Sequence, residues 1–492
     1  MIPRWALWSC AAAAVVWGAT AAHYAFTDLP KGMRLQSAAQ SVPTRNLTFL
    51  GDLAGADAYG HGFSSHAIFD AMLHNIGAAR SVVVLDCHLC GDLHHDAPGA
   101  VASLTPMAAQ LFAALVARKA AVPGLQVLVI ADPINGLYGA APAAQFAPLR
   151  TAGIQVLTAD LSRLRDRNVL YSSLWRLLLR WWGRADATRG WLPNPFSDTG
   201  PPLTARAWAE LANLKSSDRR VLIVDDDHGE LTALAGTAEP AMASSIDTVT
   251  ALQVPGAAVQ PLLNSELDLA RSLGWSGSLT PPATVAPRPA AGPAAEAVQL
   301  QWLGEGAIRD ALLNHIAAAT DGDSIDIASA SLSDRRLIDA LLAASRRGAT
   351  VRMILDPQKT ASLWGRANQS VGSELIAASD GRIHVAWYRT HSEQFRAALM
   401  LIHGNGPTWM LTGSASLTRR DLGDYDLSLD AALSGPATAP PLARAQVFFN
   451  TLWNERGPPG IEYTADVDAW ADPSQLRYWT YRFMELLGIS RT

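Results

Sequence analysis

The chain has 492 residues, and 49% of them are hydrophobic, so it is long enough for two or three domains with well-buried cores. Its 39 basic and 44 acidic residues give a formal net charge of −5 at pH 7. This balance provides no overall attraction to polyanions. It disfavours a nuclease or another nucleic-acid-binding protein, because binding would then require a local basic patch on this chain.

Residues 1–26 have the layout of a signal peptide or signal anchor. Arg4 precedes an apolar run over 5–17, and small residues follow at 18–22. A positive charge, an apolar run and small residues in this order are typical of an export signal, and the run reaches the length of a membrane span only if 18–26 are included. The sequence leaves cleavage near Ala21 and retention as an anchor equally open. Both predict a protein of the cell envelope, either periplasmic or anchored in the inner membrane.

Residues 45–275 are predicted to form a first lobe in which helices and strands alternate. Such alternation indicates a mostly parallel sheet covered by helices on both faces. The expected helices are 66–79 and 107–121, and the expected strands are 81–89, 125–132, 154–158, 220–225 and 231–236.

Two cysteines, Cys87 and Cys90, lie at the end of the first of these strands, with His94 and His95 just beyond. Together they offer enough candidate ligands for a metal ion, or the cysteines could form a disulfide. Alternate side chains of a strand point to opposite faces, however, so one tetrahedral centre would require the strand to break. Small, buried, unbonded side chains are therefore favoured, and no metal is expected.

An insertion at 171–196 belongs to the first lobe alone and interleaves tryptophans with arginines. One interpretation is a lipid headgroup boundary, where indole is half-buried and guanidinium meets phosphate. The favoured alternative is a partly buried helix whose indoles pack between lobes while its arginines face water. The aromatic stretch 476–487 presents the same choice, and there docking onto the domain is favoured. The interleaved residues are Trp175, Trp181, Trp182 and Trp191 with Arg176, Arg180, Arg184 and Arg189.

Residues 276–298 are rich in proline, alanine and glycine, a composition that predicts an interdomain linker. The second lobe is then expected over 299–492. Its sequence repeats that of the first lobe: 68–79 aligns with 308–319 at an offset of 240, and 124–133 aligns with 348–357. A third pair of matching segments follows in the same order, 220–225 with 236–238 and 398–403 with 413–415. Three ordered matches predict an internal duplication.

The closing segment of the second lobe, 411–425, resembles the closing motif of the phospholipase D superfamily, and bacterial cardiolipin-synthase-like proteins are the most similar members. The resemblance extends over about 48–488, with further similar segments at 131–135, 170–175, 190–196 and 387–395. It implies an α/β fold of two phospholipase-D-like α/β/α sandwich lobes packed around a shared cleft.

In that family each half supplies His-x-Lys, four residues, Asp, and then Gly-Ser-x-Asn. One histidine attacks phosphorus and the other protonates the leaving alkoxide, which imidazole can do because its pKa lies near neutrality. The lysines and the hydroxyl and amide side chains hold the phosphoryl oxygens.

Placed on this chain, both motifs are degenerate. The first has Asp218 at the histidine position, Arg220 at the lysine position and Asp225 at the aspartate position, followed by Thr237. The second has Arg396, Ala398 and His403 at the same three positions, followed by Ser414.

The replacements remove the two-histidine mechanism, because guanidinium stays protonated and Arg396 is neither a nucleophile nor a useful acid. The phosphate-binding types that remain are Arg220, Arg396, Thr237 and Ser414, and the resemblance implies no cofactor. An alternative is that the cleft has closed and these groups pair internally, for example Asp218 with Arg396.

The sequence therefore favours a membrane-associated, catalytically impaired pseudoenzyme that binds a phospholipid or phosphodiester. Its expected partners are an anionic phospholipid or membrane surface, or an active homologue. The alternative is an active phospholipid phosphodiesterase or phosphatidyl transferase with a rearranged pair such as Asp218 and His403. Whether the protein is an enzyme stays open at this point.

Overall fold

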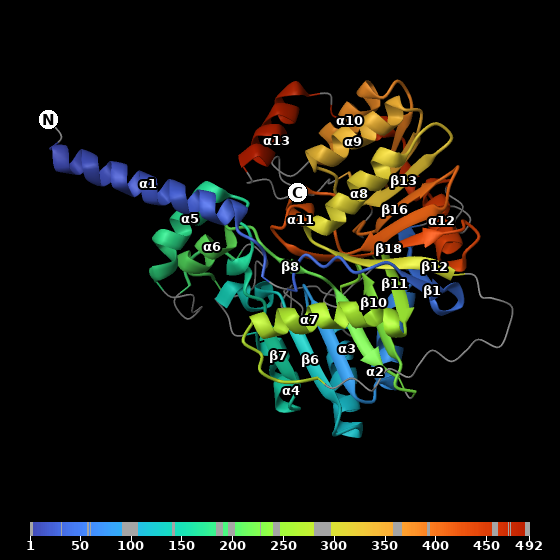
Figure 1. Cartoon of the computed structure of the whole chain (residues 1–492), viewed down its shortest axis with the longest axis horizontal. Coiled ribbons are helices and arrows are strands. Elements are labelled where there is room, and N and C mark those ends of the chain that lie inside the picture. Colours follow the sequence, from blue (N-terminus) through green and yellow to red (C-terminus); the bar gives the residue numbers. More distant parts are fainter. Residues whose placement is uncertain are drawn as a thin grey trace.

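The computed structural model describes residues 3–30, 32–56, 59, 61–90, 107–139, 143–183, 190–194, 202–226, 228–239, 247–279, 297–357, 367–390, 394–454, 461–470, 472 and 474–487. Within these ranges, two large sheets with flanking helices form two lobes, and a long N-terminal helix extends from them (Figure 1).

The sheet of the first lobe has the strand order β2-β11-β10-β9-β5-β6-β7. Strands β5, β6 and β7 are parallel to one another, and the remaining pairs are antiparallel. The bounds are β2 Thr48–Asp52, β5 Val82–Cys87, β6 Gln126–Ala131, β7 Gln155–Thr158, β9 Val221–Asp225, β10 Leu231–Gly236 and β11 Val249–Pro255.

The sheet of the second lobe has the order β1-β12-β18-β17-β16-β13-β14-β15-β19, and β8 pairs with β18 beside this path. The bounds are β1 Gln40–Pro43, β8 Ser217–Asp218, β12 Ala297–Gly304, β13 Ser324–Ser329, β14 Thr350–Leu355, β15 Ile383–Tyr388, β16 Ala398–His403, β17 Thr408–Gly413, β18 Leu427–Gly435 and β19 Thr464–Ala465. A small separate sheet pairs β3 Ala54–Ala56 with β4 Gly62–Ser64.

The two sheets repeat one topology. The order β2-β11-β10-β9-β5-β6-β7 returns as β12-β18-β17-β16-β13-β14-β15, with the same parallel and antiparallel pairs in the same places. The predicted α/β architecture with its duplicated lobes is confirmed at this level. The predicted linker falls mostly outside the described residues, and its last two residues already belong to β12.

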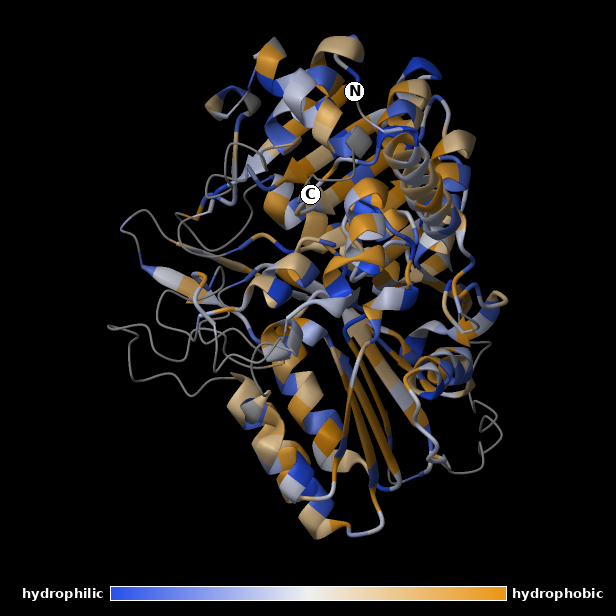
Figure 2. Cartoon of the chain, turned by 90° about the vertical axis from the view of Figure 1, so that its left-hand side faces the viewer, coloured by the Kyte–Doolittle hydropathy of each residue, from blue (hydrophilic) through white to orange (hydrophobic). Residues whose placement is uncertain are grey.

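Helices cover the outer face of each sheet, and both inner faces share one core. In β5, Val83 and Leu85 pack toward α2 and α3, whereas Val82 and Val84 join the core between the lobes, as the two-residue period of a strand requires. Strands buried on both faces need near-continuous apolar sequence, and the first-lobe sheet has it (Figure 2). The helices on the outer faces are α2 Ala67–Ala78, α3 Met107–Ala121, α4 Ala147–Thr151, α8 Gly306–Ala318, α9 Arg335–Arg346, α10 Ala367–Ala378 and α11 Arg419–Leu422. Helices α7 Gln260–Ser272 and α12 Pro440–Trp453 pack into the shared core.

The lobes exchange elements across their boundary. Strand β1, which precedes the first lobe in sequence, forms an edge of the second sheet with Gln40 opposite Leu300. Helix α12 of the second lobe packs on β2 of the first, where the Phe448 ring lies over Gly51 and edge-on to Phe49. A methyl group on Gly51 would meet that ring at 2.4 Å, so the close approach requires glycine.

The N-terminal helix α1 Arg4–Phe26 is 23 residues long and projects from the body (Figure 1). Among the described residues it is the one helix long and apolar enough to cross a membrane. Its second half packs on α5 Val169–Leu177: the Trp17 indole donates to the carbonyl of Leu170 at 3.0 Å, and the Arg176 guanidinium lies 3.7 Å from the Tyr24 ring centre.

The Trp/Arg insertion differs from its favoured interpretation. Trp175 is buried, but Trp181 and Trp182 are 69% and 74% exposed, and Arg176 is buried in an ion pair with Asp166 rather than turned to water. A short 3-10 turn at Leu179–Trp181 follows α5, and Trp191 is 72% exposed, while Arg184 and Arg189 lie outside the described residues. Helix α6 Ala205–Leu211 follows the insertion. The expectation that the indoles pack between the lobes was wrong.

The C-terminal helix α13 Gln475–Leu487 docks onto the second lobe, as expected. Tyr481 is buried and donates its hydroxyl hydrogen to the carbonyl of Ser333 at 2.9 Å. One face stays exposed and carries Leu476, Trp479 and Phe483.

The cysteines also correct an expectation. Cys87 and Cys90 form a disulfide, both buried, with Cα atoms 5.8 Å apart. The bond forms because β5 ends at Cys87, so the chain turns and brings Cys90 back beside it. His94 and His95 lie outside the described residues.

Candidate functional site

The two degenerate motifs meet between the lobes in a chain of ion pairs, which we call the interlobe cluster (Asp218, Arg220, Glu239, Asp247 and Arg396). Arg220 Nε lies 2.6 Å from Asp218 Oδ1, and Arg220 Nη2 lies 2.8 Å from Glu239 Oε1. Arg396 Nη1 reaches the other oxygen of Glu239 at 2.8 Å, and Arg396 Nε lies 3.3 Å from Asp247. Arg396 thus pairs with Glu239 rather than with Asp218, and Glu239 joins the two halves.

Backbone pairing between the lobes fixes the first motif. Ser217 and Asp218 form β8 and pair with Leu427 and Ser428 of the second lobe. The Ser217 N–H also donates to the buried carboxylate of Asp132 at 2.5 Å. Arg220 has a left-handed backbone, with φ 49°, which is unusual for a residue with a side chain. This turn directs Arg220 into the cluster and starts β9 directly after it.

Glu239 was not among the predicted site residues. It occupies the last position of Gly236-Thr-Ala-Glu, where the resembled motif has asparagine, so the motif spacing could have identified it. Burial alone would raise the pKa of Glu239, but Arg220 and Arg396 outweigh burial and lower the pKa from 4.5 to about 2. Glu239 is therefore ionised at any physiological pH and neutralises both arginines.

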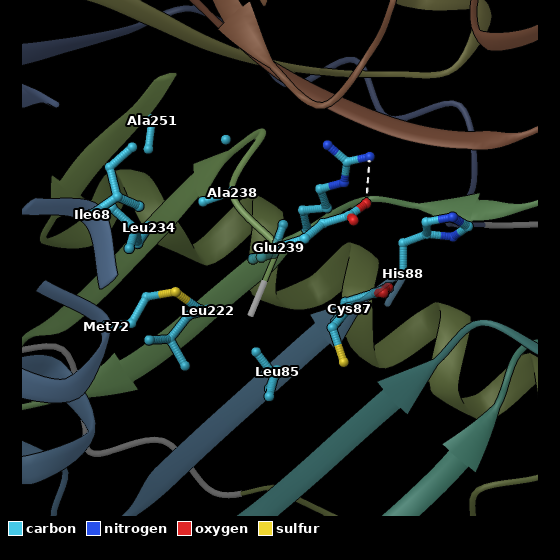
Figure 3. Close-up of a pocket in the computed structure, with 14 residues that line it drawn as sticks. Ile68, Met72, Leu85, Cys87, His88, Leu222, Leu234, Ala238, Glu239 and Ala251 are labelled. Carbon is cyan, nitrogen blue, oxygen red and sulfur yellow. Dashed lines mark ion pairs between the residues drawn. The ribbon is translucent and has the colours of Figure 1, made fainter. Parts of the chain in front are cut away.

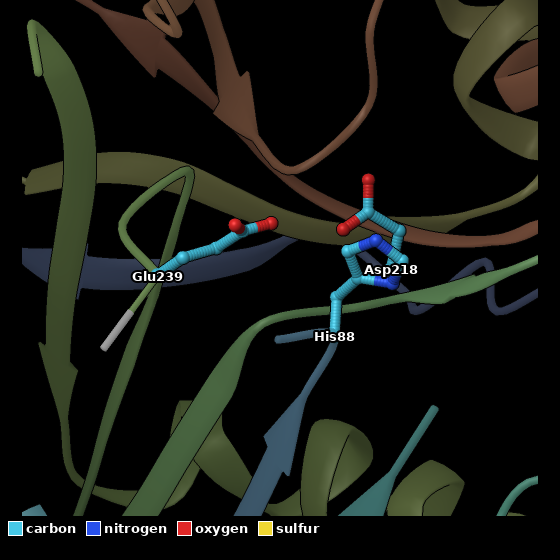
Figure 4. A group of neighbouring side chains, drawn as sticks. All are labelled: His88, Asp218 and Glu239. Carbon is cyan, nitrogen blue, oxygen red and sulfur yellow. The ribbon is translucent and has the colours of Figure 1, made fainter. Parts of the chain in front are cut away.

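His88, which directly follows β5, is a second residue that sequence reasoning missed. One ligand atom each of His88, Asp218 and Glu239 lie within 4.8 Å of one another (Figure 4). Burial would lower the pKa of His88, but Asp132, Asp218 and Glu239 raise the pKa from 6.5 to about 9. The imidazole therefore carries a positive charge at neutral pH. With it, three cations face the three carboxylates of the cluster.

A histidine and two carboxylates are ligands that a divalent metal ion accepts. Both oxygens of Glu239 and one oxygen of Asp218 are already paired with guanidinium groups, however. Two fixed positive charges at this range repel a cation, so the side-chain chemistry fits an ion-pair cluster better than a metal centre.

Thr237 and Ser414 occupy equivalent positions in the two halves, and the hydroxyl of each is hydrogen-bonded to the backbone of a neighbouring residue. The Thr237 hydroxyl donates to the carbonyl of Thr250 and accepts from its N–H, at 3.3 and 3.0 Å. The Ser414 hydroxyl does the same with Leu429, at 3.3 and 3.0 Å. Both side chains are buried.

Asp225, His403 and Ala398 take no part in the interlobe cluster. The carboxylate of Asp225 accepts the backbone N–H groups of Ser81 and Val82, each at 2.8 Å, at the end of β9 away from Asp218. His403 Nε2 lies 3.0 Å from Asp326, at the end of β16 opposite to Arg396.

Ala398 has only a methyl side chain where the resembled motif has lysine, and its carbonyl accepts from the hydroxyl of Thr412 at 2.9 Å. The structure therefore does not bring Asp218 and His403 together. The imidazole beside Asp218 is that of His88.

A small cavity adjoins the cluster, with a volume of about 20 Å³ (Figure 3). His88, Arg220 and Glu239 line its polar side, and Met72 and Leu85 line its apolar side. This volume holds about one water molecule. A phosphodiester does not fit into it.

Comparison with known families and structures identifies the domain type. Residues 312–453 match the family described as "Cardiolipin synthase, PLD-like domain", a match that covers most of the second lobe. Among curated proteins, none matches the sequence.

The solved structure of phosphatidylserine synthase from Haemophilus influenzae Rd KW20 is similar over nearly the whole chain. It superposes with a TM-score of 0.54 at 10% identity and covers 94% of this chain and 96% of that chain. At this identity the likeness shows a common fold.

Two weaker likenesses accompany it. Polyphosphate kinase from Porphyromonas gingivalis has a TM-score of 0.46 and 11% identity, over 90% of this chain and 53% of that chain. The phospholipase D family member Nuc from Salmonella typhimurium has a TM-score of 0.26 and 20% identity, over 34% of this chain and 97% of that chain.

Proposed function

Because residues 312–453 match a phospholipase-D-like domain and the fold resembles that of phosphatidylserine synthase, we propose that the interlobe cluster is a degenerate phosphodiesterase site and that the protein is a membrane-associated pseudoenzyme of the cell envelope. The observation that carries this proposal is Glu239, which is ion-paired with both arginines that a substrate phosphate would need. A phosphodiester would have to displace a buried carboxylate from two guanidinium groups, and it would gain no net positive charge.

The chemistry of the replaced positions supports the same proposal. Arg396 stays protonated and cannot accept or deliver a proton at useful rates. The hydroxyls of Thr237 and Ser414 are committed to backbone partners, and the adjoining cavity is too small for a phosphoryl group.

Purified full-length protein in detergent, supplied with phosphatidylglycerol or cardiolipin, tests this proposal. We expect no release of phosphatidic acid and no transfer of phosphatidyl groups, either by the wild type or by Asp218→Asn. Turnover in the wild type that disappears in Asp218→Asn would contradict it.

A second candidate is an active phosphodiesterase, and the position of His88 favours it. The Asp218 carboxylate would attack phosphorus, forming an acyl phosphate as the bond to the alkoxide breaks, and His88 would give its proton to that alkoxide. Water would then hydrolyse the acyl phosphate. This mechanism requires Asp218→Asn and His88→Gln each to abolish turnover, and it requires the side chain of Glu239 to move away from Arg220.

We further propose that α1 is retained as a membrane anchor. A signal that is cleaved does not need to pack on the folded body, yet Trp17 donates to Leu170, and the N–H of Asp166 donates to the carbonyl of Tyr24 at 2.9 Å. Membranes washed with alkaline carbonate should keep the protein, and intact-mass measurement should find residues 1–26 still attached. Recovery of a chain that starts near residue 22 would contradict retention.

A further inference from the structure

A second cavity, unrelated to the interlobe cluster, opens where α1 joins the body. It has a volume of about 460 Å³ and lies between the end of α1, helix α13 and the first turn of α9. Phe26 lines it and is 81% exposed. Figure 1 shows α1 leaving the body at this place, with α5 and α6 on one side and α13 on the other. We call this cavity the basic pocket.

The lining of the basic pocket is strongly cationic. Six arginines and two carboxylates line it. Arg165 is ion-paired with Asp424, and Arg335 with Asp339 and Glu374, which leaves four arginines facing two carboxylates. The arginines are Arg165, Arg309, Arg335, Arg336, Arg419 and Arg482, and the carboxylates are Asp334 and Glu485. The interlobe cluster, by contrast, is balanced in charge, so a phosphate group would be attracted to the basic pocket rather than to the interlobe cluster.

Two of these guanidinium groups have no carboxylate partner among the described residues, and a third is incompletely paired. Arg336 is exposed at the start of α9, and within the described ranges neither Arg336 nor Arg482 has an ion-pair partner. Arg482 donates to the neutral hydroxyl of Tyr478 at 2.7 Å. The Nε of Arg309 is buried and lacks a hydrogen-bond acceptor among the described residues, and its nearest carboxylate, Asp334, is 3.7 Å from Nη1. This N–H is available to donate to a ligand oxygen in the pocket.

The pocket is also held against α1 by direct bonds. Arg165 Nε donates to the carbonyl of Thr27 at 2.9 Å, and Arg165 Nη1 is ion-paired with Asp424 at 2.7 Å. The end of α1 therefore has a fixed position relative to the pocket.

The depth of the pocket follows from the length of α1. A helix of 23 residues is about 35 Å long, against about 30 Å for the hydrocarbon core of a bilayer. If α1 is embedded, its junction with α5 lies at the membrane interface, and Phe26 lies on the same side of the bilayer as the body. The exposed leucines of α5 and the exposed face of α13, which carries Trp479 and Phe483, flank the same end of α1, as expected for side chains at a membrane interface.

We propose that the basic pocket binds the phosphate group of an anionic phospholipid, with its acyl chains running along α1 past Phe26. Guanidinium groups bind phosphate through two parallel hydrogen bonds, and several such groups line the pocket. That the phosphate comes from a lipid depends on α1 being a retained anchor, whereas the affinity for phosphate does not.

The test uses the full chain purified in detergent and the variant pair Arg336→Gln/Arg482→Gln. The matched control is Arg346→Gln/Arg444→Gln, which removes the same charge from two exposed arginines that do not line the basic pocket. Binding is measured by calorimetry with three probes: short-chain phosphatidic acid, short-chain phosphatidylcholine and inorganic phosphate.

We expect phosphatidic acid to bind the wild type and the control equally, and the pocket variant to bind it at least about tenfold more weakly, because two charge-assisted contacts are lost. Inorganic phosphate should bind about tenfold more weakly than phosphatidic acid because it has no acyl chains to contact Phe26.

Three outcomes would overturn the proposal. Equal binding of phosphatidic acid by the pocket variant and the control would show that the basic pocket is not the binding site. Equal affinity of the wild type for phosphatidylcholine and phosphatidic acid would show that the pocket does not prefer an anionic lipid. Inorganic phosphate that binds as tightly as phosphatidic acid would make the site one for free anions. Because the lipids are added to solubilised protein, these results do not depend on whether the interlobe cluster is inactive or α1 spans a membrane.

Discussion

At the scale of single residues, Glu239 sets the charge of the interlobe cluster. It replaces a neutral amide of the family motif with a carboxylate that two arginines share. Asp218, Arg220 and Arg396 lie close together between the lobes. Their proximity could be predicted from the sequence, because each shortly precedes an equivalent strand of the duplicated sheet. His88 and Asp247 could not be predicted, because they follow other strands or loops and reach the cluster only through the packing of the lobes.

Replacing Glu239 by Gln should change both stability and anion binding. The loss of one carboxylate leaves two buried guanidinium groups short of a partner, which costs about 3 kcal/mol of unfolding free energy. The unpaired guanidinium charge should attract phosphate, so added phosphate should raise the Tm of Glu239→Gln more than that of the wild type, which offers phosphate only the basic pocket. Thermal unfolding at several phosphate concentrations measures both effects. An equal phosphate response in the two proteins would show that the anion binds elsewhere.

His88 should make stability depend on pH above neutrality. Its pKa is raised from 6.5 to about 9 in the folded chain, so the folded state holds a proton that the unfolded state releases. The resulting stabilisation is complete below pH 6.5 and is lost as pH rises through 9, by at most about 3 kcal/mol. Urea unfolding between pH 6 and 9.5 should show this loss in the wild type and a flatter profile in His88→Gln. Parallel profiles would exclude this role for His88.

At the scale of helices and strands, sequence periodicity located the central strands well and the exchanged ones poorly. The strands β5 and β6 are long apolar runs, and their pattern alone indicates burial. The strands β1 and β8 have four and two residues, and they exist because a distant partner pairs with them. No local pattern encodes such a pairing. The disulfide was the disfavoured alternative for a related reason, since its formation depends on where β5 ends.

The contact of α12 with β2 should be a main source of interlobe stability. Phe448 is 6% exposed and fills the space above Gly51, so Phe448→Ala should cost about 3–5 kcal/mol. Its neighbour Val447 is 64% exposed, and Val447→Ala should change stability by less than about 0.5 kcal/mol. Chemical denaturation of the two variants makes the comparison. Similar values for both would mean that α12 does not hold the lobes together.

At the scale of the whole molecule, a buried arginine outside the interlobe cluster is ion-paired with residues of both lobes. Arg219 is fully buried and lies 3.1 Å from Glu266 of α7 and 2.9 Å from Glu305 at the start of α8. The backbone N–H of Arg34 also donates to Glu305 at 2.5 Å. One side chain thus ties both lobes and the N-terminal segment.

Arg219→Met should therefore destabilise both lobes at once. It leaves two buried carboxylates without their cation, at a cost of about 3–5 kcal/mol. Arg271→Met, which removes an exposed pair with Asp268 on the same α7, should cost less than about 1 kcal/mol. Calorimetry should show one transition that moves to lower temperature in Arg219→Met. Two separate transitions, only one of which moves, would show that the lobes unfold independently.

The pairing of β1 with β12 imposes an order of events on synthesis. Gln40 leaves the ribosome 260 residues before its partner Leu300, and at 5–20 residues per second this interval lasts between roughly 10 and 50 s. During that time the nascent β1 segment has no template to pair with, while α1 is already available to the lipid bilayer. Early capture of α1 would keep the waiting segment beside the membrane, away from other ribosomes and from the aggregation that an unpaired edge invites.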